Sequence, residues 1–190
     1  MCMNIQVDPG GAAPSARERI LHTAHELFYR DGVRATGIDR VIAESGVAKV
    51  TFYRHFPSKN ELIRAYLATR HEHWMGWFTE ALARHGGGPG AIVPVVEEWF
   101  RDERYRGCAF INSVGELGGV LPDVLEIARS HKQDMTRAIA AVLPKSRQRA
   151  KIAQAVALSI DGAIVRAQFD SSPDGALSAL DRIVKSLLKA

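Results

Sequence analysis

The residues best suited to chemistry lie in one short stretch, from Lys49 to His55, where basic, hydroxylated and aromatic side chains follow one another. A lysine can donate to the acceptor atoms of guanine, a threonine can donate or accept, and a threonine or valine methyl group can pack on thymine. Lys49, Val50 and Thr51 offer these groups early in a predicted helix, the part that usually meets base edges in the major groove. The stretch therefore predicts readout of a DNA sequence.

Two short helices joined by a glycine are expected to position these side chains. The first is predicted over about residues 38–45 and the second over about residues 48–56. Gly46 lies where the chain must bend sharply, and glycine accepts the positive φ that such a turn needs. Phe52 and Phe56 are four residues apart, so both point inward and leave the polar side chains outside. This arrangement is typical of a DNA-binding helix-turn-helix.

The sequence from Gly46 to Lys59, GVAKVTFYRHFPSK, is similar to the recognition-helix signature of the TetR family of transcriptional regulators. The similarity extends back to Ser15 and covers about a quarter of the chain closely. Two positions depart from the family pattern: Ile42 stands where a small alanine is usual, and Ala48 where a serine often caps the recognition helix. The resemblance implies a dimeric, all-helical repressor with an N-terminal DNA-binding head and a C-terminal ligand-binding body.

The resemblance also implies which side chains contact the DNA backbone. It assigns phosphate contacts to Tyr53, His55 and Lys59, and weaker ones to residues near the start of the preceding helix. For single residues other than Lys49, Thr51, Tyr53 and His55, a simply solvated polar side chain remains the alternative. The full predicted DNA-binding set is Thr36, Gly37, Arg40, Lys49, Val50, Thr51, Tyr53, Arg54, His55 and Lys59.

Helical periodicity continues to the end of the chain without strand-like alternation, so we expect an all-α fold of about nine helices. Residues 1–14 are rich in Gly, Pro and Ala and are expected to form a disordered tail. A helix-turn-helix domain is expected over residues 15–62, with its motif at about 37–56, and a ligand-binding and dimerisation domain over residues 63–190. After the head, helices are predicted over about residues 58–84, 91–105, 108–117, 123–143, 146–169 and 175–189.

Aromatic residues concentrate in helices that the family places around a ligand cavity. The predicted pocket residues are Trp74, Trp77, Phe78, Trp99, Phe100, Phe110, Asn112 and Glu116. Asn112 and Glu116 are one helical turn apart and could orient a small-molecule effector. A packed core without a cavity is an equally weighted alternative for the aromatic residues. The Glu116 carboxylate needs a partner if buried, either a cationic effector or an arginine such as Arg101, Arg104 or Arg106.

The last two predicted helices, at about residues 146–169 and 175–189, carry strong apolar stripes. The first of them presents small and branched residues, which allow close approach of another helix. Two such helices suit a four-helix interface with a second copy of the chain. The sequence therefore predicts a homodimer.

No motif in the sequence indicates catalysis, a cofactor or a metal. There is no nucleophile–base pair or phosphate-binding glycine loop. His71 and His73 are two residues apart, whereas a helical zinc site needs a spacing of four. Cys2 and Cys108 provide no disulfide framework. We interpret Cys108 as a buried, inert thiol, with redox sensing as the less favoured alternative.

Composition sets weaker bounds on function. The formal charge is +4, but residues 16–62 hold eight basic against six acidic residues, so bulk charge does not identify a DNA-binding head. A second group of basic residues is expected to be a solvated face: Arg137, Lys145, Arg147, Arg149 and Lys151. The sequence lacks a long apolar span and a signal-peptide pattern, so we expect a cytoplasmic protein without membrane association.

These observations favour a transcriptional repressor that leaves a palindromic operator when a small molecule binds its C-terminal domain. One alternative is a helical small-molecule carrier or enzyme with a vestigial DNA-binding head. Another is a constitutive DNA-binding protein without an effector, which requires a body that is solid throughout.

Overall fold

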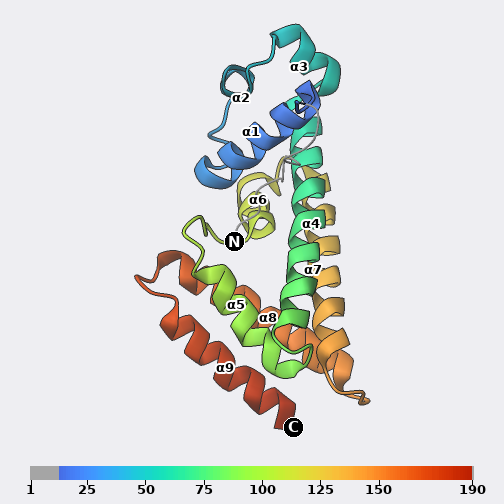
Figure 1. The fold of residues 1–190 in the computed structure, drawn as a ribbon, viewed down its shortest axis with the longest axis vertical. Helices are drawn as coiled ribbons and strands as arrows, with labels where there is room; N and C mark the ends of the chain where they lie inside the picture. The colour runs from blue at the N-terminus through green and yellow to red at the C-terminus, as the bar shows by residue number, and fades with distance from the viewer. Residues whose placement is uncertain (1–12, 190) are drawn as a thin grey trace. The chain divides into compact units, whose positions relative to one another are not determined.

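The computed structural model describes residues 13–189, so the first twelve residues of the predicted tail lie outside the described part. Within these residues the chain forms nine α-helices and one 3-10 turn and has no strand, which confirms the all-α class (Figure 1). The elements are α1 (Ala16–Asp31), α2 (Ile38–Ser45), α3 (Lys49–His55), α4 (Lys59–Arg84), η1 (Pro89–Ala91), α5 (Ile92–Phe100), α6 (Ala109–Leu117), α7 (Pro122–Val142), α8 (Arg149–Phe169) and α9 (Asp174–Lys189).

Packing divides the described chain into two compact units. One, which we call the head unit, contains residues 13–73 and 109–128. The other, the body unit, contains residues 74–108 and 129–189. This division differs from the predicted functional boundary at residue 62, because α6 and the first residues of α7 pack with the N-terminal helices.

The head unit is built on α1. Its N-terminus is fixed by a capping box, in which the Glu18 N–H donates to Ser15 Oγ at 3.3 Å and the Ser15 N–H donates to Glu18 Oε2 at 2.7 Å. Both α2 and α3 pack against α1 (Figure 1). Gly46 has a φ of +64°, as the predicted turn requires, and both Phe52 and Phe56 are buried.

The body unit is held together by α5, α8 and α9, which pack on one another (Figure 1). Small and branched residues on the buried face of α8, among them Ala153, Val156 and Ile160, allow α9 to approach closely. From α9, Leu177 and Leu180 fill the same core. Hydrophobic burial of this kind supplies most of the stability of a helical domain.

Two helix boundaries differ from the predicted ones. The helix expected to reach about residue 105 ends at Phe100, because the carboxylate of Asp102 accepts the backbone N–H of Arg104 at 2.9 Å and holds a turn there. The helix expected from residue 146 begins at Arg149, after a turn in which the Arg149 N–H donates to the Ser146 carbonyl. Among residues 13–189, no helix has the length and apolar character needed to span a membrane.

Candidate nucleic-acid interface

The outer face of α3 consists of exposed side chains, and a buried phenylalanine anchors the helix on the head unit. Phe52 is fully buried and fixes the helix on the head unit, while Val50 is 77% exposed and Tyr53 is 43% exposed. The Tyr53 ring packs edge-on against the Phe52 ring, with centroids 5.3 Å apart. Arg54 is also exposed. An exposed valine beside an aromatic ring and basic groups is the composition expected of a surface that meets a partner.

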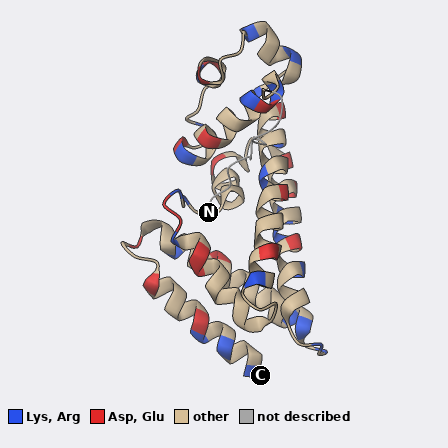
Figure 2. Ribbon diagram, viewed as in Figure 1, with Lys and Arg blue, Asp and Glu red and all other residues tan. Residues whose placement is uncertain are grey.

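Lys49 begins α3 and is exposed. Its Nζ lies 3.4 Å from Oδ1 of Asp39 on α2, and both side chains are largely in solvent. An exposed ion pair of this kind contributes little to stability. The lysine can therefore exchange its partner for a base or a phosphate. Figure 2 shows basic positions on α3, and no residue of that helix is acidic.

The prediction that the Thr36 side chain contacts a phosphate is wrong. It is fully buried, and its Oγ1 donates to the Gly32 carbonyl at 2.7 Å. The hydroxyl thus satisfies a carbonyl at the C-terminus of α1 and fixes the connection to α2. Gly37, in contrast, is the exposed N-cap of α2, where no side chain caps the first turn.

The remaining predicted DNA-binding residues differ in availability. Arg40 is paired twice, with Asp31 at 2.8 Å and with Glu44 at 2.7 Å, so a contact to DNA requires it to leave these carboxylates. Thr51 and His55 are half-buried on the flanks of α3.

Lys59 lies at the start of α4 and is half-buried. Burial lowers its pKa, and the negative charge of Glu116 partly offsets that effect. Lys59 therefore has an acidic neighbour within the head unit.

Glu116 is not a pocket residue of the body, which corrects its predicted role. It lies on α6 within the head unit, and its Oε2 accepts the backbone N–H of Arg34 at 2.7 Å. The carboxylate also lies against Gly32, at which a Cβ would come within 3.2 Å of both its oxygens. Its partner is thus a backbone amide, and none of the arginines considered from the sequence. Glu116 fastens α6 to the connection between α1 and α2.

The aromatic residues predicted to line a ligand cavity divide between the two units. Phe110 and Asn112 lie in the head unit with Glu116, whereas the three tryptophans, Phe78 and Phe100 lie in the body unit. We call the group Trp74, Trp77, Phe78, Val95, Val96, Trp99 and Ile160 the aromatic core. The Trp74 and Phe78 rings stack with centroids 4.6 Å apart, and the space among these side chains does not admit a water molecule. The predicted pocket residues are therefore divided between the two units, and those in the aromatic core are tightly packed in this conformation.

The indole N–H groups of Trp74 and Trp99 are buried in the aromatic core without a hydrogen-bond acceptor. Trp77 is half-buried, and its N–H donates to Glu98 Oε1 at 3.4 Å. A buried donor without an acceptor costs about 1–3 kcal/mol. The aromatic core is thus dense, yet it retains two unused donors.

The sequence interpretation overlooked two groups of buried polar side chains. In the head unit, Arg70 is 1% exposed, and its guanidinium lies within hydrogen-bonding distance of His25 and over the ring of Tyr29. An available signal was its position on α4, four residues after Tyr66 in an apolar stripe.

The second group surrounds Cys108 in the body unit. The thiol is 2% exposed, and the Nζ of Lys132 lies 2.5 Å from Oδ1 of Asp161. Burial opposes the charge of Lys132, but the neighbouring Cys108 and Asp161 raise its pKa overall. The burial of Cys108 agrees with its interpretation as an inert thiol, since reactive cysteines need access to solvent. Among residues 13–189, no cluster of three or more His, Cys, Asp or Glu side chains could hold a metal ion.

Comparison with known proteins agrees with the geometry of the head. Residues 20–66 match the family model described as bacterial regulatory proteins of the tetR family. An uncharacterized helix-turn-helix transcriptional regulator of Bacillus subtilis, YxaF, is 46% identical over 46 residues, which is 24% of each chain. The match thus spans about a quarter of that relative. An uncharacterized helix-turn-helix regulator of Lactococcus lactis is 24% identical over 131 residues, 66% of this chain and 67% of the other.

A structural likeness extends over nearly the whole chain. The crystal structure of SCO4454, a TetR-family transcriptional regulator from Streptomyces coelicolor, is similar with a TM-score of 0.80 and 27% identity. The aligned region covers 92% of this chain and 94% of the SCO4454 chain. The sequence likeness is concentrated in the head, and the likeness of fold includes the body.

Proposed function

We propose that this chain is a cytoplasmic repressor that a small molecule releases from a palindromic operator. The premise is that the chain belongs to the TetR family of helix-turn-helix transcriptional regulators and is not an enzyme. The observation that carries the proposal is the outer face of α3. Lys49, Val50 and Tyr53 are exposed there, although exposure of the apolar surface of a valine and of a tyrosine ring to water is unfavourable.

Recognition would divide these side chains by role. Lys49 at the start of α3 suits the acceptors of a guanine, and Val50 and Thr51 suit a thymine methyl group. Tyr53 and Lys59 suit phosphates, which fix the register of the helix on the duplex. Thr36 is excluded from this set as a side-chain contact, because its hydroxyl is used within the head unit.

The body unit supports association with a second copy through α8 and α9. Both helices leave large apolar side chains in solvent: Leu158 at 74%, Val165 at 43% and Phe169 at 64% exposure on α8, and Ile183 at 43% on α9. Burial of such residues in a four-helix interface would remove them from water. Sedimentation of the parent and of Leu158→Glu tests this step. The parent should sediment as a dimer and the variant as a monomer, and a monomeric parent at micromolar concentration would contradict it.

Two features support a response to an effector. The buried indole N–H groups of Trp74 and Trp99 could donate to the acceptor atoms of a ligand that opens the aromatic core. Within the head unit, the bond between Glu116 and Arg34 ties α6 to the helix-turn-helix, so displacement of α6 would strain that connection. The effector acts only through the difference between its affinities for the DNA-binding form and the released form.

A constitutive DNA-binding regulator is the second candidate, favoured by the dense packing of the aromatic core. One experiment separates the candidates. Duplexes bound by the full chain are selected from a random pool, and compounds are then screened for release of the selected duplex. A palindromic winner released by a compound supports the leading proposal. A palindromic winner that no compound releases favours the constitutive candidate, and failure to enrich any duplex contradicts both.

A further inference from the structure

We propose that Arg70 anchors a binding site for a small organic anion, most simply an aromatic carboxylate, between α1 and α4 of the head unit. Arg70 lies on α4 and is 1% exposed. Its two contacts come from α1: the Nη1–His25 Nε2 distance is 3.0 Å, and the guanidinium carbon lies 4.2 Å from the centre of the Tyr29 ring. The buried Nη2 has no hydrogen-bond partner.

Among residues 13–189, no carboxylate forms an ion pair with the Arg70 guanidinium. An arginine stays protonated at any pH the fold survives, so it cannot escape burial by losing its proton. His25 and Tyr29 offer a ring nitrogen and a π face, and neither supplies a compensating charge. A buried cation without an anion is strongly unfavourable, so the missing partner points to a ligand.

Two other partly buried cations among residues 13–189 are paired with carboxylates. Arg64, also on α4, donates to Asp123 at 2.6 Å. Lys132 in the body unit donates to Asp161 at 2.5 Å. Arg70 is more deeply buried than either, yet it has no carboxylate. Its environment therefore differs from the ordinary ion pairs of the same molecule.

The surrounding side chains indicate which anion fits. Tyr66 makes edge contacts with the rings of His25 and Phe28, with centroids 5.6 and 5.4 Å apart. Aromatic side chains of this kind can pack against another ring, and the N–H of Arg70 Nη2, which has no partner, can donate to a carboxylate oxygen. Tyr29 is half-buried, so rotation of its ring would admit the anion from solvent.

The site would act on the head itself. Both α2 and α3 pack against α1, so an anion bridging α1 and α4 would fix the helix on which the proposed DNA-binding helices rest. This site is additional to the aromatic core, and its occupation does not depend on the proposed effector there.

Binding of sodium benzoate to the full chain, measured by calorimetry, tests the site, with benzamide as the uncharged isostere and acetate and inorganic phosphate as further anions. Benzoate should bind saturably and benzamide should not. Arg70→Gln should weaken benzoate binding roughly 10- to 100-fold, as expected for a lost charge-assisted hydrogen bond. The matched control Arg64→Gln, on the same helix, should bind like the parent. The proposal is overturned if none of the three anions binds the parent saturably, or if Arg70→Gln binds benzoate as the parent does.

Arg70→Met keeps the test decisive if Arg70→Gln does not fold. An apolar side chain of similar length removes the buried charge, so this variant should melt at or above the temperature of the parent in a buffer without added anions. Its melting temperature should not respond to benzoate. A rise with benzoate equal to that of the parent would refute the role of Arg70.

Binding to the selected duplex separates this inference from the proposed function. If no anion binds but the chain enriches a palindromic duplex, the anion site fails and the regulator stands. If benzoate binds through Arg70 but no duplex is enriched, the reverse holds.

Discussion

The outer face of α3 and the aromatic core of the body unit both carry residues predicted to bind a partner, but they present those residues differently. On α3, Lys49, Val50 and Tyr53 are exposed, and their burial requires another molecule. In the aromatic core, Trp74, Phe78 and Trp99 are already buried against one another. The first surface is ready for a rigid partner, whereas the second must move before it can admit one.

The difference in exposure between the two sets of side chains has a physical cause. A DNA groove lies outside the protein, so the side chains that read it must stay in solvent until binding. An effector is small enough to be enclosed, so its site competes with the packing of the same apolar side chains. Exposure therefore supports the proposed DNA-binding face, whereas among buried residues composition does not distinguish an effector site from a plain core.

The largest expected effect is on the aromatic core. Trp74→Ala should lower the free energy of unfolding by about 3–5 kcal/mol, because it leaves a cavity among packed rings. Urea denaturation measures the change, and Thr79→Ala at an exposed position of α4 is the control. A loss below about 1 kcal/mol would show that the core is loose and would remove the contrast with α3.

The next effect separates DNA binding from stability. Lys49→Ala should weaken binding to the selected duplex by about 1–3 kcal/mol, or roughly 5- to 150-fold, because it removes a base contact. The melting temperature should stay near that of the parent, since the Lys49–Asp39 pair is exposed. Fluorescence anisotropy with a labelled duplex measures affinity, and Lys145→Ala in the body unit is the control. Equal affinities of parent and variant would contradict the assignment of Lys49.

A smaller effect is expected at the link between α6 and the helix-turn-helix. Glu116→Gln keeps the shape and removes the charge, so the bond to the Arg34 N–H should weaken by about 1 kcal/mol. Hydrogen exchange of the Arg34 amide should accelerate, while amides in the body unit should not change. Unchanged protection at Arg34 would show that Glu116 does not hold this connection.

The smallest expected effect is that of one hydroxyl group. Tyr53→Phe should weaken duplex binding by about 0.5–1 kcal/mol, because it removes a phosphate contact and keeps the ring that packs on Phe52. The loss should be the same for specific and nonspecific duplexes, as a phosphate contact carries no sequence information. A loss confined to the selected duplex would instead assign Tyr53 to base readout.

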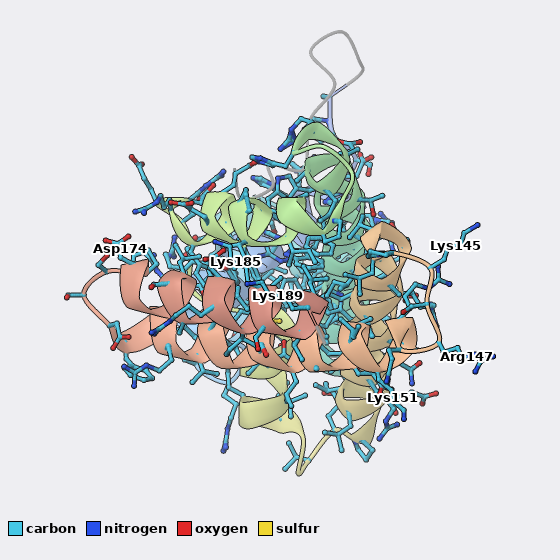
Figure 3. The ribbon with its side chains drawn as sticks, turned by 90° about the horizontal axis from the view of Figure 1, so that it is seen from below. Lys145, Arg147, Lys151, Asp174, Lys185 and Lys189 are labelled. Carbon is cyan, nitrogen blue, oxygen red and sulfur yellow. The ribbon has the colours of Figure 1, made fainter. Side chains whose placement is uncertain are left out.

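The second predicted basic group lies in the body unit. Four of its five residues are exposed as predicted, although Arg137 forms an ion pair within α7, and Arg149 is half-buried. Figure 3 shows Lys145, Arg147 and Lys151 projecting outward near the turn between α7 and α8. All three are exposed. Their position gives Lys145→Ala its value as a control, since it removes a positive charge from a region outside the head unit.

Predictions from local signals matched the structure closely. The bounds of α2 and α4 follow the predicted ones, since Gly46 ends α2 and Ser58 Oγ accepts the Glu61 N–H at 3.2 Å at the start of α4. The early end of α5 escaped prediction because it depends on a side-chain bond from Asp102 to the backbone. The role of Glu116 escaped because its partner is 82 residues away in the sequence.

The sequence by itself determined the helical class, the glycine turn and the outward face of α3, because each follows from spacing and backbone preference within a single turn or helix. Only the tertiary structure decided that Thr36 is buried, that Glu116 bonds the backbone of Arg34 and that Nη2 of the buried Arg70 has no hydrogen-bond partner. Those outcomes depend on which helices meet, and a hydrogen bond or an unpaired charge exists only once distant segments have been brought together.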